Sequence, residues 1–226
     1  MKIFFDTEFT GLHKDTTLIS IGLIDKYGRT FYGEFSDYDE SKCDNWIREN
    51  VIKHLKWSKE GPVEDFVNIY DNTWEAFGSK EYIKIVLTEW LSKYNNVELV
   101  SDCCHYDMVL FIDIFGDAWS IPDVVNPACH DINQDIAKYF DISEREAFDL
   151  SREKIIEKVN IDNQDIANHF DISEREKIIE KVNIDNQDIA NHFDISEREK
   201  IINIEGDKHN ALYDAKVIKE IYKIVN

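Results

Sequence analysis

Apolar and polar residues over the first 35 positions are arranged in a way that predicts three β-strands. The apolar, β-favouring segments span residues 2–9, 16–25 and 29–35. Polar turns at Lys14-Asp15 and Tyr27-Gly28 separate these segments. Because consecutive strands joined by short turns usually pair with each other, we expect the chain to begin with an antiparallel meander.

Helical spacing of apolar residues follows in two segments of the middle region. From Ser41 to Leu55, apolar residues recur at intervals of three and four, which predicts one continuous helix. From Ser79 to Tyr94 a second helix is predicted, because Ser79 can serve as its N-cap and Glu81 lies in its first turn.

The rest of the α/β pattern consists of one strand, two helices and a short extended segment. A strand is predicted near residues 97–101, a helix from near His105, and an extended segment near 124–129. The C-terminal helix is expected from about Lys208 to Ile224, with these residues toward the core: Ala211, Ala215, Val217, Ile218 and Ile221. A meander followed by alternating helices and strands predicts an α/β fold, with a mixed sheet flanked by helices.

A perfect tandem repeat interrupts this pattern. Residues 154–176 (KIIEKVNIDNQDIANHFDISERE) recur without change as residues 177–199, and a diverged copy spans 131–146. The pattern of apolar residues in each unit predicts two short helices, for example 163–170 and 173–182. Together these helices would have an apolar face that neighbouring units could bury by stacking. We therefore expect an inserted array of helical hairpins over 130–203, between the two parts of the main domain, 1–129 and 204–226.

The repeat unit also resembles the first helix and turn of bacterial helix-turn-helix modules. Its second helix, however, begins Glu174-Arg175-Glu176-Lys177, which is balanced in charge and therefore poorly suited to phosphate contacts. A stacking or self-associating hairpin is favoured over DNA recognition. A duplication without a role is the third interpretation.

The charge of the chain argues against nonspecific coating of nucleic acid. The formal net charge is −20, and residues 130–203 alone contribute 10 − 19 = −9. Bound divalent cations would offset part of this charge locally. No run of about 18 apolar residues is present and no signal-peptide pattern begins the chain, so we expect a cytoplasmic protein with no membrane span. The four cysteines lack zinc-site spacing and are interpreted as reduced thiols.

Two fragments at opposite ends of the chain suggest a metal-dependent site. Asp6 and Glu8 are two residues apart in the first strand, so their side chains point from the same face and can share a cation. His209 precedes Asp214 by five residues in a predicted helix, where about 100° per residue places the two side chains about 140° apart. Carboxylates around hard cations, with a histidine as base, are suited to metal-assisted phosphodiester hydrolysis.

These fragments resemble the motifs of the DEDD superfamily of 3′→5′ exonucleases. Asp6-Thr7-Glu8 matches its first motif, and His209 to Asp214 matches the third motif of its histidine branch (DEDDh). Asp107 is the candidate for the middle motif, with Asp102 and Asp113 as nearby alternatives. The segments around Asp6, Ser20, Tyr106 and His209 look most like the small RNase AS-type exoribonucleases, which are relatives of RNase T.

The resemblance implies a ribonuclease-H-like fold and a two-metal hydrolase. Two Mg²⁺ or Mn²⁺ ions would be held by Asp6, Glu8, Asp107 and Asp214, with Asp6 bridging the ions and His209 as the general base. The product would be a 5′-nucleoside monophosphate released from a single-stranded 3′ end, with RNA favoured over DNA. The expected substrate contacts are Thr7, Phe9 and Leu12.

Three further expectations accompany the resemblance. Members often form homodimers, so a homodimer is expected here. An AT-rich bacterium or its phage would suit the composition. The alternative function is that of an interaction protein, which would act through the repeat hairpins and retain only a vestigial nuclease site.

Overall fold

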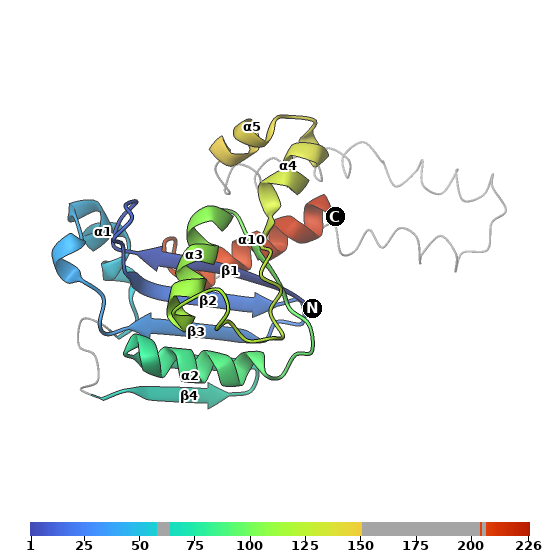
Figure 1. Ribbon diagram of the computed structural model, residues 1–226. Coiled ribbons are helices and arrows are strands. Elements are labelled where there is room, and N and C mark those ends of the chain that lie inside the picture. Colours follow the sequence, from blue (N-terminus) through green and yellow to red (C-terminus); the bar gives the residue numbers. More distant parts are fainter. Residues whose placement is uncertain (58–63, 151–203, 205–206) are drawn as a thin grey trace, which may run out of the picture. The chain divides into compact units, whose positions relative to one another are not determined.

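A seven-stranded mixed sheet forms the centre of the computed structural model, which describes residues 1–57, 64–150, 204 and 207–226 (Figure 1). In spatial order its strands are β4 (Phe66–Tyr70), β5 (Thr73–Gly78), β3 (Thr30–Phe35), β2 (Leu18–Asp25), β1 (Lys2–Phe9), β6 (Glu98–Ser101) and β7 (His130–Asp131). Strand β2 pairs antiparallel with both β1 and β3, which confirms the predicted meander. Strand β6 runs parallel to β1, so the sheet is mixed, as the α/β pattern predicted.

Helices cover both faces of this sheet. Helices α2 (Lys80–Leu91) and α3 (Cys104–Phe115) contact the face to which Ile3 and Phe5 of β1 point, and together they form the main core. Helix α10 (Ala211–Val225) contacts β1 and β2 on the other face, where Phe4 packs on Tyr222 with ring centroids 5.2 Å apart. Alternate residues of β1 therefore point to opposite layers, and Asp6 and Glu8 belong to the α10 side.

The prediction of one continuous helix over residues 41–55 was wrong, because three shorter helical segments occupy this region. The structure has a 3-10 turn η1 (Glu40–Lys42), helix α1 (Asn45–Asn50) and a second 3-10 turn η2 (Ile52–His54). The side chain of Asp44 accepts the backbone N–H of Ile47 at 2.8 Å and starts a new helix there. Because Cys43 is extended, η1 and α1 cannot join.

A β-hairpin that the sequence pattern did not predict extends the sheet beyond β3. Strands β4 and β5 pair antiparallel, with Ile69 opposite Trp74, and β5 pairs parallel to β3. The hairpin turns at Asp71, which has a φ of 48°. Asp adopts this left-handed conformation more readily than most residues. The sequence Tyr70-Asp71-Asn72-Thr73 therefore favours a hairpin turn, which could have indicated these two strands.

Helix α10 begins three residues later than predicted and approaches the sheet closely. Asn210 is its N-cap, and its side-chain oxygen accepts the backbone N–H groups of Leu212 and Tyr213 at 3.2 and 3.3 Å. A Cβ atom on Gly22 of β2 would lie 2.3 Å from the Leu212 nitrogen. Only glycine leaves room for this approach. The residues predicted to face the core are all buried: Ala211, Ala215, Val217, Ile218 and Ile221.

The diverged copy of the repeat belongs to the main unit. Residues 1–149 and 204–226 form one compact unit, because β7 pairs with β6 and α4 (Ile132–Phe140) contacts α10. Helix α5 (Glu144–Asp149) follows α4 after Asp141, whose φ is 53°. This boundary differs from the predicted start of the insertion at residue 130. The identical copies at 154–199 lie outside the described residues, so their helical hairpins stay a prediction.

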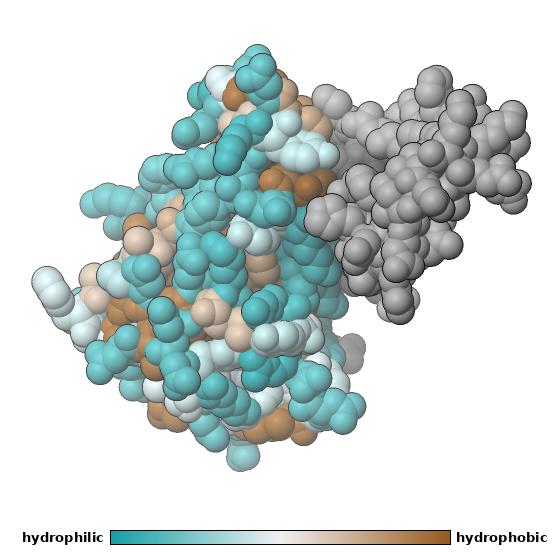
Figure 2. All heavy atoms as spheres, turned by 90° about the vertical axis from the view of Figure 1, so that its right-hand side faces the viewer, coloured by the Kyte–Doolittle hydropathy of each residue, from teal (hydrophilic) through white to brown (hydrophobic). Residues whose placement is uncertain are grey.

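Polar side chains dominate the face of the molecule shown in Figure 2, where apolar groups are interspersed among them. This distribution agrees with a sequence in which 32% of the residues are charged. Within the described part of the chain, no helix is long and apolar enough to cross a membrane.

Candidate active site

Three aspartates meet where the parallel strands β1 and β6 end. Carboxylate oxygens of Asp6, Asp102 and Asp107 lie within 4.8 Å of one another. Lys2 pairs with Glu98 and Phe4 with Val100, so the same register brings Asp102, directly after β6, level with Asp6. Helix α3 then begins at Cys104 and places Asp107 in its first turn. This edge of the sheet is where parallel strands commonly bind ligands.

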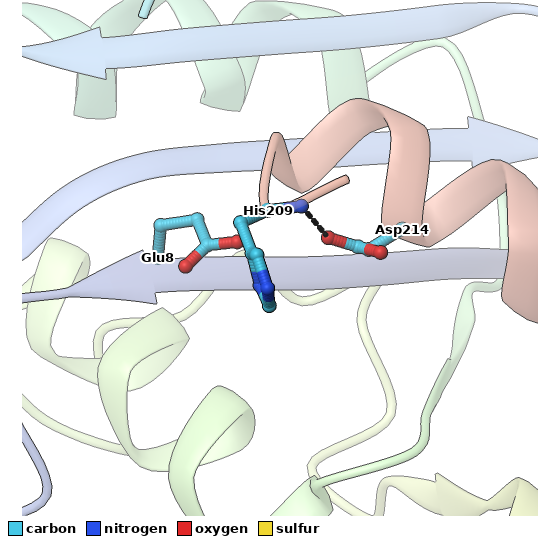
Figure 3. A group of neighbouring side chains, drawn as sticks. All are labelled: Glu8, His209 and Asp214. Atoms are coloured by element: carbon cyan, nitrogen blue, oxygen red, sulfur yellow. Dashed lines mark hydrogen bonds between the residues drawn. The ribbon is translucent and has the colours of Figure 1, made fainter. Parts of the chain in front are cut away.

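A second group lies beside the first and joins β1 to α10. Ligand atoms of Glu8, His209 and Asp214 also lie within 4.8 Å of one another. Figure 3 shows Glu8 on β1, Asp214 on the first turns of α10, and the His209 side chain between them. The structure thus brings together every residue that the two terminal motifs predicted for the site.

His209 is not part of a helix, which corrects the geometry expected from its spacing to Asp214. It precedes the N-cap of α10 and has a φ of 62°, in the left-handed region. Its backbone N–H donates to Asp214 Oδ2 at 3.0 Å, and this bond helps to hold the unusual backbone (Figure 3). The two side chains therefore converge because of this turn and not because of helical periodicity.

Asp107 is buried and held by hydrogen bonds from two neighbouring strands. Its Oδ1 accepts the Thr7 hydroxyl at 2.6 Å and the Thr7 backbone N–H at 3.2 Å, and its Oδ2 accepts the Ser101 hydroxyl. Burial and the nearby charge of Asp102 raise the pKa of Asp107 to about 7, although the bonds from Ser101 and Thr7 oppose this rise. The carboxylate is therefore fixed in orientation but costly to ionise.

The two carboxylates of β1, Asp6 and Glu8, are also costly to ionise. Burial raises the pKa of Asp6 well above its usual range, and the charges of Asp107, Asp214, Glu8 and Asp102 raise it further. Burial, followed by Asp214 and Asp107, does the same to the pKa of Glu8. A divalent cation would stabilise acidic groups held this close in their ionised form, and carboxylate oxygens are the donor atoms that hard divalent cations prefer.

Comparison with known proteins agrees with this arrangement. Residues 1–225 match the model of the family described as the 3′-5′ exoribonuclease Rv2179c-like domain. The chain belongs to this family. Two relatives from Mycobacterium tuberculosis are 26% identical to it over 136 residues, which cover 59% of this chain and 73% of each relative. They are named 3′-5′ exoribonuclease MT2234.1 (strain CDC 1551 / Oshkosh) and 3′-5′ exoribonuclease Rv2179c (strain ATCC 25618 / H37Rv).

Membership of the Rv2179c-like family confirms the resemblance predicted from the terminal motifs. The family match also spans the repeat region, because it runs from residue 1 to residue 225. The mixed sheet with helices on both faces is compatible with the ribonuclease-H-like fold that the resemblance implied.

A buried hydrogen-bond chain supports the histidine end of the site. The Asn210 side-chain amide donates to the Tyr32 hydroxyl at 3.1 Å, and Tyr32 donates to Glu34 at 2.8 Å. Glu34 also accepts the backbone N–H groups of Lys56 and Trp57. Burial, and then the charge of Glu34, raises the pKa of Tyr32 well above its usual value, so Tyr32 stays a donor. This chain fixes the N-cap of α10 on β3.

The residues predicted to contact substrate have different surroundings. Thr7 is buried and its hydroxyl is bonded to Asp107. Phe9 is partly buried and stacks on Tyr106, with ring centroids 5.5 Å apart and planes 9° apart. Leu12 is 73% exposed. Leu12 is thus available beyond the end of β1, whereas Phe9 also packs against the main core and Thr7 lies behind the carboxylates.

Two further residues lie in the site, although neither was selected for it from the sequence. Asp102 was an alternative to Asp107, yet the structure places both in the same cluster. Its even spacing from Glu98 and Val100 was the available signal. Trp46 was not among the residues predicted for the site, but its ring contacts that of His209 with centroids 5.0 Å apart. No local pattern indicated this contact, because the two residues are far apart in the sequence.

Proposed function

We propose that this chain is a divalent-metal-dependent 3′→5′ exoribonuclease. It would hydrolyse the terminal phosphodiester bond at the 3′ end of single-stranded RNA and release a 5′-nucleoside monophosphate. The observation that supports this most directly is the meeting of two acidic groups at the end of β1, one of which includes His209. Membership of the Rv2179c-like family supports RNA as the substrate.

The residues present fit a pair of Mg²⁺ or Mn²⁺ ions. Their donors are carboxylate oxygens, and the raised pKa values of Asp6 and Glu8 show unfavourable negative charge that cations would offset. Asp6, Glu8, Asp107 and Asp214 would hold the ions. When bound, such ions offset the charge of the phosphate and lower the pKa of the attacking water.

The chain's own residues would contribute orientation and proton transfer. His209 would accept the proton of the attacking water, because imidazole titrates near neutral pH. As the water oxygen bonds to phosphorus, the bond from phosphorus to the 3′-oxygen breaks and the terminal nucleotide leaves as its 5′-monophosphate. The 3′-oxygen takes up a proton from solvent, which leaves a shortened strand with a 3′-hydroxyl. Thr7 and Ser101 would hold Asp107 in place through the bonds described above. In this proposal Thr7 acts on Asp107 rather than directly on the substrate.

Phe9 and Leu12 are proposed to contact the terminal base. Leu12 is exposed, and the ring of Phe9 is supported by Tyr106. Stacking of this kind contributes roughly 1–3 kcal/mol per base and tolerates any sequence. The net charge of −20 predicts weak nonspecific binding to the rest of the strand. The homodimer and the cytoplasmic location stay predictions.

The test is degradation of 5′-labelled single-stranded RNA and DNA of the same sequence, with Mg²⁺, Mn²⁺ or EDTA. The proposal predicts a metal-dependent ladder that shortens from the 3′ end, 5′-nucleoside monophosphates as products, and faster cleavage of RNA. Asp6→Asn should reduce kcat on the order of a hundredfold or more, because it removes a charge at the reacting centre.

Asp71→Asn is the matched control for the charge change. Asp71 is exposed in the β4–β5 turn, and asparagine tolerates its φ of 48°. This variant should cleave like the wild type. The absence of cleavage with either metal, or cleavage that Asp6→Asn leaves intact, would refute the proposed function.

A further inference from the structure

An exposed tryptophan lies against the histidine of the site. Trp46 of α1 is 53% exposed, although an indole ring usually gains stability from burial. Its ring and the His209 imidazole form an edge-to-face pair, with centroids 5.0 Å apart and planes 73° apart. Edge-to-face pairs of this kind hold both rings in a preferred mutual orientation.

The segment that presents Trp46 is anchored to the sheet. Ile47 and Val51 are buried and pack with Ile19 of β2 in a small apolar cluster. The side-chain amide of Asn50 donates to the Trp46 carbonyl oxygen at 2.8 Å, and Asp44 caps the helix. Trp46 is therefore held by a short, fixed helix, so its indole starts from a defined backbone position.

The same segment makes a second contact with the turn that precedes α10. His54 Nδ1 lies 3.6 Å from Asp207 Oδ2, two residues before His209. The Asn210 backbone N–H in turn donates to the Asp207 carbonyl oxygen at 3.2 Å. Residues 44–54 thus contact this turn at both its start and its histidine.

The backbone of His209 is fixed by the bond to Asp214, but that bond does not set the direction of the imidazole. A general base must lie within hydrogen-bond reach of the proton that it accepts, so the rotation of the ring decides whether it can act. An aromatic neighbour on an anchored helix restricts this rotation through the edge-to-face contact.

We infer that Trp46 is a positioning residue that holds the His209 imidazole in its catalytic orientation. The inference rests on the proposed function, in which His209 is the general base. It predicts that Trp46 affects turnover through His209 and contributes little to binding of the RNA. Direct stacking of a base on the exposed indole is the competing role, and the experiment below separates the two.

The experiment is a double-mutant cycle on single-stranded RNA with saturating Mn²⁺. Trp46→Ala should reduce kcat by about tenfold or more and change KM by less than about threefold, since misplacing a catalytic group affects the chemical step. Trp46→Phe should recover most of kcat, because it keeps an aromatic ring. In the His209→Ala background, Trp46→Ala should cause no further loss. Trp119→Ala is the control, because Trp119 is 97% exposed and should tolerate truncation with unchanged kcat.

A spectroscopic measurement tests the contact without any turnover. At a centroid distance of 5.0 Å the ring current of the indole should shift the imidazole proton resonances of His209, which can be assigned by their loss in His209→Ala. Trp46→Ala should move these resonances toward their random-coil positions, whereas Trp119→Ala should leave them unchanged. Far-UV circular dichroism of each variant shows that the comparison concerns folded proteins.

Two outcomes would overturn the inference while leaving the proposed function intact. One is a loss of kcat on Trp46→Ala that persists in the His209→Ala background. The other is an increase in KM with unchanged kcat, which would indicate base stacking. A His209→Ala variant with wild-type kcat would instead refute the proposed base, and the role of Trp46 with it.

Discussion

Gly22 is the position at which one added methyl group should disturb the site through the backbone alone. It lies opposite Asp6 in the sheet, and the first turn of α10 passes directly over it. A Cβ atom there would be 2.3 Å from the Leu212 nitrogen and 2.4 Å from the Ala211 carbonyl carbon, whereas ordinary contact begins at 3.4 Å. The start of α10 would therefore have to retreat by about 1.1 Å (3.4 − 2.3) to accommodate Gly22→Ala.

This displacement should reduce catalysis more than it reduces stability. The turn with His209 precedes the helix and Asp214 lies in its first turn, so both would move away from Glu8. A misplacement of about 1 Å can cost on the order of a hundredfold in rate. Overpacking of this kind typically lowers the free energy of unfolding by about 1–3 kcal/mol, which a folded domain can tolerate.

The assay is kcat on single-stranded RNA with saturating Mn²⁺, together with the thermal unfolding midpoint. Gly33→Ala is the matched control in the neighbouring strand β3. The added Cβ atom would meet only side chains there, those of Phe31, Ile83 and Ile21 at 3.1–3.4 Å, so α10 need not move. The reasoning would be refuted if folded Gly22→Ala kept a kcat within about threefold of Gly33→Ala, given the expected hundredfold loss.

Two further predictions concern Asp107. The pKa of Asp107 is about 7 in the folded state and 3.8 ordinarily, so between these pH values the folded state binds more protons than the unfolded state. The contribution of the protonated Asp107 to the free energy of unfolding is therefore full below about pH 4 and is lost as the pH rises through 7. The thermal unfolding midpoint of the metal-free protein should therefore decrease as the pH is raised from 4 to 7, and this decrease should be smaller in Asp107→Asn. An equally large decrease in the variant would contradict the assignment. Thr7→Val removes a bond that favours the ionised carboxylate, so calorimetry at pH 7 should show weaker Mn²⁺ binding by about tenfold, whereas Thr7→Ser should bind like the wild type. Equal affinity of Thr7→Val and wild type would exclude the proposed role of Thr7.

The sequence alone determined those features that depend on local periodicity. Alternation along residues 2–9 placed Asp6 and Glu8 on one face of a strand, and the structure confirms that β1 has this form. The Ser79 side chain accepts the backbone N–H of Tyr82, as its predicted N-cap role requires. The apolar spacing of the C-terminal helix likewise identified its buried face. Each feature involves residues within one or two turns of each other, so the chain itself fixes their relation.

Tertiary structure decided how distant residues meet at the site. Asp102 lies beside Asp6 because β6 pairs with β1 in a particular register, and Trp46 contacts His209 because α1 is anchored on β2. His209 adopts its left-handed backbone where Gly22 lets α10 approach the sheet. Such contacts depend on side-chain packing between segments far apart in the sequence, and no local pattern specifies them. The sequence therefore identified the main chemical groups of the site, whereas packing decided which of their neighbours orient them.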